Sequence, residues 1–306
     1  MKLRYSYTNG VSEFPLLGDT IGQNFKRTVE QYPNNLALAF PFQNIELTYQ
    51  EFWDKTTQLA KSLLATGLAN GDRVGIWAPN RYEWTIVQYA TARIGLVLVN
   101  VNPAYREKEL VYVLNQSGCR MLIAANSFKT SFYEELWKSA KSSCPEVKYS
   151  CFLDTEWDDL LKKADVVSDE ELQKAEELVQ FDDPVNIQYT SGTTGFPKGV
   201  TLSHHNIQNN GYFIGRRLHY THEDSVCIPV PFYHCFGMVI GNLACTSCGA
   251  TMVVPSEAFE PEITLQMVEK YKCTSLYGVP TMFIAELNLP SFAKYDLTSL
   301  RTGVMA

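Results

Sequence analysis

The chain has 306 residues, of which 45% are apolar and 19% are charged. This length fits one large domain or two ordinary ones, and the composition excludes a disordered chain and a coiled coil. The net charge of −7, from 26 basic and 33 acidic residues, argues against a general nucleic-acid binder, which needs an excess of Lys and Arg. Residues 168–183 contribute −6 of this charge through seven carboxylates and one lysine, so the remainder is close to neutral.

Helix and strand patterns alternate along most of the chain. The first helix signal is a capping box formed by Thr48 and Glu51, and the helix that it opens is predicted to stop at Gly67. Strands are predicted at 73–78, 96–101, 121–124, 148–153, 185–190, 226–230, 251–254, 274–277 and 300–306, and further helices at 107–115, 130–142, 207–218, 236–248, 260–271 and 281–288.

One more helix is predicted between the first two of these strands. Asn80, with Glu83 at the third position after it, is the expected cap of a helix that runs to Gly95. The βαβα order predicts an α/β fold with a parallel sheet covered by helices on both faces. Residues 155–183 interrupt this order with polar side chains, which predicts a surface helix and a linker. Since a domain rarely ends inside a buried strand, the strand at 300–306 makes us expect a truncated chain.

Targeting and membrane signals are weak in this sequence. The N-terminus lacks the apolar core of a secretory signal and the Arg-rich stripe of a transit peptide. Residues 225–256 carry no charge, but prolines and polar side chains interrupt them, which predicts strand, helix and strand rather than a transmembrane span. The eight dispersed cysteines indicate reduced thiols in an intracellular compartment. Cys245 and Cys248 lack a second pair, so we expect small buried residues there, not a metal or redox site.

Residues 189–199, Tyr-Thr-Ser-Gly-Thr-Thr-Gly-Phe-Pro-Lys-Gly, carry the clearest chemistry. The glycines let the backbone turn its amides toward a common point, four hydroxyls add donors, and Lys198 adds a positive charge. Such a nest binds anions, and together with a lysine its natural ligand is a polyphosphate. A Walker loop needs Gly-Lys-Ser/Thr at the start of a helix, whereas residues 200–203 alternate like a strand. A flexible surface turn is the other alternative, but it does not explain Pro-Lys-Gly after a buried strand.

This segment resembles the phosphate-binding signature of the AMP-binding, adenylate-forming superfamily, which includes acyl-CoA synthetases, luciferases and peptide-synthetase adenylation domains. Residues 231–237 (PFYHCFG) are similar to the second core motif, and 202–206 (LSHHN) fit the segment after the loop. The resemblance covers nearly the whole chain, is greatest to the medium-chain acyl-CoA ligases, and is poor at 155–180. It implies stacked doubly wound sheets covered by helices, as the incomplete N-terminal core of an adenylate-forming enzyme over residues 1–306.

The resemblance also implies an activity. Family members activate a carboxylic acid with ATP and Mg²⁺ to an acyl-adenylate, and coenzyme A then displaces AMP to give a thioester. A fatty carboxylate with a pKa of about 4.3 is already an anion at neutral pH, so no general base is needed. The loop, Lys198 and Mg²⁺ would neutralise the phosphates and the leaving pyrophosphate. The implied phosphate-binding residues are Thr190, Ser191, Gly192, Thr193, Thr194, Gly195, Phe196, Pro197 and Lys198.

By the same resemblance, a second group of residues would contact the acid: His234, Phe236, Gly237, Met238 and Gly241. A neutral imidazole at His234 would donate a hydrogen bond to the carboxylate or the adenylate, and the alternative is a buried, satisfied histidine. The others would line an acyl tunnel, with ordinary helix packing as the alternative. The acyl length is not predicted, because each methylene contributes only about 0.8 kcal/mol.

Two further segments are assigned no catalytic role. Residues 204–206 (His-His-Asn) are expected to open a helix capped by Ser203 or Asn206. Tyr277 and Gly278 look like the family's adenine motif but lack its glutamate, so they are not expected to bind adenine.

The remaining family motifs would lie beyond Ala306, including those for magnesium, adenine and ribose and the mobile domain with the adenylation lysine. No catalytic residue is therefore assigned, and we expect negligible turnover from the 306-residue chain alone. An aryl-acid ligase and a non-catalytic nucleotide-binding or partner-binding protein stay open as alternatives. The implied location is mitochondrial, although no presequence is visible, and otherwise cytoplasmic. The expected partners are a small carboxylic acid, ATP and coenzyme A, without nucleic acid or a transmembrane segment.

Overall fold

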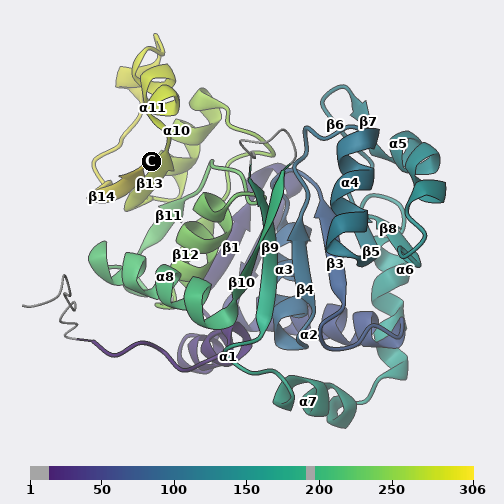
Figure 1. Cartoon of the computed structure of the whole chain (residues 1–306). Helices are drawn as coiled ribbons and strands as arrows, with labels where there is room; N and C mark the ends of the chain where they lie inside the picture. Colours follow the sequence, from purple (N-terminus) through teal and green to yellow (C-terminus); the bar gives the residue numbers. More distant parts are fainter. Residues whose placement is uncertain (1–13, 191–196) are drawn as a thin grey trace, which may run out of the picture.

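The computed structural model describes residues 14–190 and 197–306, whose strands form two six-stranded sheets (Figure 1). Sheet A has the strand order β14-β13-β11-β12-β1-β2, sheet B has the order β10-β9-β4-β3-β5-β8, and β6 and β7 form a separate hairpin. The strands are β1 Leu36–Phe40, β2 Ile45–Thr48, β3 Arg73–Trp77, β4 Val97–Asn100, β5 Cys119–Ala124, β6 Ser127–Phe128, β7 Ser131–Phe132, β8 Tyr149–Phe152, β9 Pro184–Thr190, β10 Lys198–Ser203, β11 Ser225–Cys227, β12 Thr251–Val253, β13 Ser275–Gly278 and β14 Thr302–Met305.

Helices cover these sheets, which confirms the predicted α/β fold of doubly wound sheets (Figure 1). The α-helices are α1 Ile21–Gln31, α2 Tyr49–Ala65, α3 Tyr82–Arg93, α4 Glu107–Ser117, α5 Tyr133–Ala140, α6 Trp157–Leu161, α7 Asp169–Glu177, α8 His204–Arg217, α9 Ala244–Thr246, α10 Pro261–Lys270 and α11 Pro280–Leu287. One π-helix, η4 Phe236–Leu243, and four short 3₁₀ helices, η1 Pro41–Gln43, η2 Lys141–Ser143, η3 Lys162–Val166 and η5 Phe292–Lys294, complete the described elements.

Both sheets are parallel except at one edge each. β2 pairs antiparallel with β1 in sheet A, and β10 pairs antiparallel with β9 in sheet B. All the other strand pairs within the two sheets are parallel. The carboxyl ends of the parallel strands therefore meet at one edge of each sheet, which is where α/β proteins place their ligands.

Helix α3 lies in the interior of the molecule. Its residues from Glu83 to Arg93 are all buried, which explains why its sequence shows no polar face. The hydroxyl of Tyr89 donates to the Asn242 carbonyl at 3.1 Å, and this bond ties α3 to the π-helix η4. The rings of Phe25 and Phe52 lie 4.6 Å apart and pack with Tyr89 where α1, α2 and α3 meet.

Several sequence predictions are confirmed locally. The Thr48 hydroxyl and the Glu51 carboxylate form the expected capping box at the start of α2. Gly67, just after that helix, has a φ of 82°, a value that favours glycine. The Ser203 hydroxyl caps α8 by accepting from the Asn206 amide.

Two predictions for helices need correction. The helix expected at 236–248 is a π-helix over residues 236–243, followed by the short α9. Asn80 does not cap α3, because Arg81 precedes the helix and makes no side-chain cap bond. The Asn80 side chain instead bonds to Val230 and Phe232, and Glu83 pairs with Arg81. Tertiary contacts thus replace a local cap that the sequence pattern favoured.

The polar segment 155–183 folds as α6, η3 and α7 and is anchored to the core. Trp157 and Leu160 are buried, and the Glu176 carboxylate pairs with the Arg93 guanidinium at 2.6 Å. The Arg93 side chain is 2% exposed and lies 3.6 Å from the centre of the Trp53 ring. The expected surface helix is α7, and a buried cation holds it to α3.

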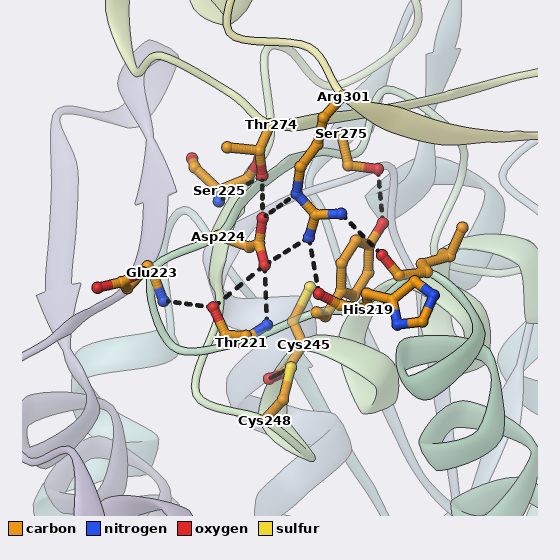
Figure 2. Close-up of polar contacts among 12 residues, drawn as sticks. His219, Thr221, Glu223, Asp224, Ser225, Cys245, Cys248, Thr274, Ser275 and Arg301 are labelled. Atoms are coloured by element: carbon orange, nitrogen blue, oxygen red, sulfur yellow. Dashed lines mark hydrogen bonds and ion pairs between the residues drawn. The ribbon is translucent and has the colours of Figure 1, made fainter.

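The last strand of the chain is also well anchored. Figure 2 shows the guanidinium of Arg301 facing the Asp224 carboxylate, with a shortest contact of 2.7 Å. The Thr274 hydroxyl donates to the same carboxylate at 2.6 Å, and Arg301 also donates to the His219 carbonyl. This network joins β14 to the loop before β11, so residues 302–305 form the strand that the sequence predicted.

The uncharged stretch 225–256 forms β11, the helical residues 236–246 and β12, as predicted. Within residues 14–190 and 197–306, no helix combines the length and the apolar character that crossing a bilayer requires. Cys245 is buried and Cys248 is half-buried, and both are free thiols (Figure 2). The Cys248 thiol donates to helix carbonyls, including that of Ala244 at 3.3 Å, which fits the predicted packing role.

Candidate functional site

The two ends of the predicted phosphate loop lie opposite each other across β9 and β10. Lys198 is the strand partner of Thr190, and both residues are exposed. The predicted binding residues Ser191, Gly192, Thr193, Thr194, Gly195 and Phe196 lie outside the described residues. Lys198 begins a strand and not a helix, so the exclusion of a Walker loop is confirmed. β9 and β10 are antiparallel neighbours, here called the hairpin, and Thr190 and Lys198 pair at the carboxyl end of β9.

Helix α4 supports this hairpin from one side. The Tyr112 hydroxyl donates to the Pro197 carbonyl at 3.0 Å, directly before Lys198. The Tyr189 hydroxyl donates to the Val113 carbonyl at 3.3 Å, and the rings of Tyr112 and Tyr189 meet edge to face. Burial raises the pKa of Tyr189 to about 12, so this hydroxyl stays protonated and keeps its donor at neutral pH. These bonds fix the end of the loop that bears the cation.

A pocket of about 460 Å³ adjoins the hairpin. Its lining comes from β9, β10, α8, the π-helix and Cys235 just before that helix. Most of these side chains are apolar, and the carboxamides and a hydroxyl lie among them. The described residues that line it are Gln188, Thr190, Val200, Leu202, Asn206, Ile207, Asn210, Cys235, Val239 and Ile240. The pocket thus joins one end of the phosphate loop to the residue beside His234.

His234 is exposed, so the alternative of a buried, satisfied histidine is wrong. Its Nδ1 accepts a hydrogen bond from the Phe236 amide at 3.1 Å. A nitrogen that accepts carries no proton, so the neutral ring bears its hydrogen on Nε2. The local turn therefore leaves the neutral His234 ring one hydrogen-bond donor, and the role that the resemblance implies for it stays a prediction.

The other residues proposed for the acid belong to the π-helix and make close packing contacts. Phe236 stacks on Tyr277 with 5.5 Å between ring centres. A side chain at Gly237 would lie 2.6 Å from the Pro231 carbonyl oxygen, and one at Gly241 would press on Ile228. None of these packing contacts involves the pocket, and the role of Phe236, Gly237 and Gly241 toward an acyl chain stays a prediction.

Met238 is also buried, at 1% exposure. Its sulfur lies 3.3 Å from the Asn100 amide nitrogen and 3.5 Å from that of Gln188. Gln188 lines the pocket, so Met238 lies one residue behind the pocket wall, and its part in binding the acid likewise stays a prediction.

Sequence reasoning missed most of the pocket lining. Val200 and Leu202 alternate along β10, and that alternation was the available signal for a shared apolar face. The helical pattern alone does not show that Val239 and Ile240 line the pocket while Met238 does not. The reason is that a π-helix does not follow the usual helical period. Tyr277 donates to the Ile240 carbonyl at 3.0 Å and is buried, and the expectation that it does not bind adenine stays a prediction. Over the described ranges, no three His, Cys, Asp or Glu side chains gather as a metal site.

The sequence of this chain is similar to those of known proteins. A family model described as "AMP-binding enzyme" matches residues 25–306. The Bacillus subtilis (strain 168) protein YngI, which carries the name of an acyl-CoA synthetase, is 45% identical over 311 residues, covering 95% of this chain and 56% of that protein. The protein named "Medium-chain acyl-CoA ligase ACSF2, mitochondrial" from Danio rerio is 40% identical over 325 residues, covering 99% of this chain and 54% of that protein.

A solved structure shares the fold. The crystal structure of a long-chain-fatty-acid-CoA ligase (FadD1) from Archaeoglobus fulgidus has a TM-score of 0.83 and 23% identity, covering 97% of this chain and 59% of that chain. The chain spans about half the length of the curated relatives it matches.

Proposed function

The chain belongs to the AMP-binding enzyme family, among the adenylate-forming acyl-CoA ligases, and from this premise we propose that the protein activates a fatty acid with ATP. The carboxylate oxygen attacks the α-phosphorus of ATP, and the bond to pyrophosphate breaks. The sulfur of coenzyme A then attacks the acyl carbon, AMP leaves, and the thiol proton passes to solvent. A medium-chain acid is the proposed substrate, supported by the names of relatives from Danio rerio and Homo sapiens.

One observation carries this proposal: Thr190, at the start of the phosphate loop, and Cys235, next to His234, line the same pocket. A ligand in this pocket would lie against Thr190, where the predicted loop begins, and against Cys235, whose sulfur is 3.7 Å from His234 Nδ1. The apolar side chains of β10 and α8 suit an alkyl chain. Burial raises the pKa of the Cys235 thiol, so a neutral thiol and not a second anion faces the carboxylate.

The residues of the loop would act by charge and position. Lys198 supplies a cation at the outer phosphates, and Mg²⁺ would arrive with ATP and neutralise the remaining oxygens. Coenzyme A and Mg²⁺ belong to this proposal through the family. A mitochondrial location is likewise a proposal, supported only by the names of the vertebrate relatives, since the Bacillus relative comes from a bacterium.

The test measures acyl-adenylate, trapped as a hydroxamate, and thioester formation by the complete protein. Octanoate, palmitate and benzoate represent medium-chain, long-chain and aromatic acids. Lys198→Ala should lower kcat/KM by about 100- to 1,000-fold, because one charged group at the phosphates is lost. Lys138→Ala is the matched control, since Lys138 is exposed on α5, away from the hairpin.

Octanoate should be the best of the three acids. A preference for benzoate would favour an aryl-acid ligase, and nucleotide binding without any adenylate would favour a non-catalytic binding protein. Equal activity of the Lys198→Ala and Lys138→Ala proteins would refute the assignment of the loop.

A further inference from the structure

The segment that carries His234 follows a strand of sheet A, but its backbone is bound by side chains at the ends of strands of sheet B. Residues 230–238, here called the His234 segment, follow β11 and run into the π-helix. The Asn80 amide nitrogen donates to the Val230 carbonyl at 3.0 Å, and the Asn80 oxygen accepts from the Phe232 amide at 2.8 Å. The Asn100 amide nitrogen donates to the Tyr233 carbonyl at 3.0 Å. Two asparagines thus bind the backbone on both sides of Pro231 and directly before His234.

These two asparagines come from the carboxyl ends of neighbouring strands. Asn100 is the last residue of β4, and Asn80 follows β3 by three residues. Each is 2% exposed, and a buried amide without partners would be costly, so their hydrogen bonds account for their presence in the core. Their partners lie 133 and 150 residues away in the chain. The contacts therefore serve the tertiary arrangement and not a local turn or cap.

One of them also reaches the strand that leads to the phosphate loop. Asn186, in β9, donates from its amide nitrogen to the Asn100 oxygen at 2.8 Å. Asn186 is buried and lies four residues before Thr190. A continuous line of hydrogen bonds thus runs from β9 through Asn100 to the backbone carbonyl that precedes His234.

We propose that Asn80 and Asn100, here called the asparagine clamp, are positioning residues that fix His234 relative to the hairpin of Thr190 and Lys198. Neither asparagine takes part in the chemistry. The clamp sets the distance between groups that stand on different sheets, and a misplacement of about 1 Å can cost about 100-fold in rate. The kinetic part of this inference rests on the proposed function, whereas the effect on the His234 segment does not.

The chain offers a matched control in Asn209. This asparagine is 6% exposed and also binds a distant backbone segment at two points. Its amide nitrogen donates to the Leu17 carbonyl at 3.0 Å, and its oxygen accepts from the Leu17 amide at 2.7 Å. Asn209→Ala therefore removes comparable hydrogen bonds, which go to Leu17 and His205 and not to the His234 segment.

The first measurement is hydrogen exchange of the complete protein, followed on peptides that cover residues 230–238 and 14–20. Asn80→Ala and Asn100→Ala should each speed exchange in 230–238 by about tenfold. Local opening of this segment then costs less free energy, because it no longer has to break the hydrogen bonds of the clamp. Asn209→Ala should speed exchange in 14–20 instead. Unchanged exchange in 230–238 for both clamp variants overturns the clamp, whether or not the protein forms adenylates.

The second measurement is adenylate formation at saturating acid over a range of ATP concentrations. Asn100→Ala should lower kcat by about 10- to 100-fold and change the KM for ATP by less than about threefold. In a His234→Ala background, Asn100→Ala should cost less than about threefold, because a residue that acts through His234 loses its effect with it. Asn209→Ala should keep kcat.

Additive losses, or an equal loss from Asn209→Ala, would show a general effect on folding and overturn the positioning role. If Asn100→Ala does not fold, Asn100→Asp keeps the acceptor for Asn186 and removes the donor to Tyr233, and Asn80→Ala gives an independent second variant. Absence of adenylate from the parent protein would count against the proposed function alone, and hydrogen exchange would still decide the clamp.

Discussion

Glu286 is a buried carboxyl on α11 for which the proposed reaction has no use. Its residue is 3% exposed. Burial raises the pKa of Glu286 to about 7 from an ordinary value of 4.5. The folded protein therefore holds a proton that the unfolded chain releases at lower pH.

We expect stability to fall as the pH rises from about 4.5 to about 7, since ionising this carboxyl disfavours the folded state in that range. Glu286→Gln should remove this dependence and raise the free energy of unfolding by about 2 kcal/mol at pH 8, less than the full shift implies because solvent screens the charge. The measurement is urea unfolding of both proteins at pH 5 and pH 8.

His204 has the opposite effect on the pH dependence of stability over part of the same pH range. Burial lowers its pKa to about 4, so the unfolded chain gains a proton first as the pH falls below 6.5. Both proteins carry His204, and its contribution cancels in the difference between them. A constant difference between the variant and the parent from pH 5 to pH 8 would contradict the role of Glu286.

Residue-level predictions succeeded where the signal was local and failed where it was tertiary. The Thr48 capping box depends on residues within one turn, and the structure has it. Asn80 is followed by Glu83 at the same spacing, but the Asn80 side chain bonds to a loop 150 residues away. Nothing in the sequence distinguishes these two uses of an N-cap residue.

At the scale of elements, the π-helix η4 decides how the His234 segment enters the core. Gly237 lies in its first turn, where the backbone passes so close to the Pro231 carbonyl that a Cβ would lie 2.6 Å from that oxygen. The sequence predicted a helix here, and the structure has the wider π-helical turn, whose backbone also bonds to α3 through Gln88, which donates to the Met238 carbonyl at 3.1 Å. The apolar periodicity of the sequence therefore does not show whether this helix is of the α or the π type.

Gly237→Ala should lower the free energy of unfolding by about 1–3 kcal/mol, because the added methyl group forces a backbone carbonyl to move. It should also lower kcat for adenylate formation, since that movement shifts the residues next to His234. Gly18→Ala is the control, because a Cβ at Gly18 meets no atom within 4 Å. Chemical denaturation and hydroxamate trapping measure the two effects, and equal stability of the two variants would show that the close approach is harmless.

At the scale of the whole molecule, alternating patterns predicted the fold class but not the strand order. β1 pairs with β12 through Leu38 and Met252, which are far apart in the sequence, and such pairings follow from packing of the complete chain. The long motif predicted the family, whereas the pocket and the contacts of Asn80 and Asn100 depend on how sheets A and B meet. Membership of the family was therefore easier to predict than these contacts.

An ion pair between Arg301 and Asp224 joins β14 of sheet A to the loop before β11. Asp224 is 5% exposed, and its environment lowers its pKa: burial opposes the charge, but hydrogen bonds from Arg301, Thr274 and the Thr221 amide outweigh this cost. A carboxyl whose pKa is lowered on folding stabilises the protein above the pKa of the unfolded chain, and that stabilisation is lost as the pH falls. The contribution of Asp224 should therefore be complete at pH 7 and should decline below about pH 4.

Asp224→Asn should lower the free energy of unfolding by about 1–3 kcal/mol at pH 7, because Arg301 loses its charged partner and a donor replaces an acceptor. This difference in the free energy of unfolding between variant and parent should be smaller at pH 3, where the Asp224 carboxyl of the parent also begins to take up a proton. Asp159→Asn is the control, since Asp159 forms a surface pair with Lys162 whose side chains are 76% and 73% exposed, and such pairs contribute little. Urea unfolding at both pH values measures the difference, and a deficit at pH 3 as large as that at pH 7 would mean that the geometry of Asp224, and not its charge, holds β14 in sheet A.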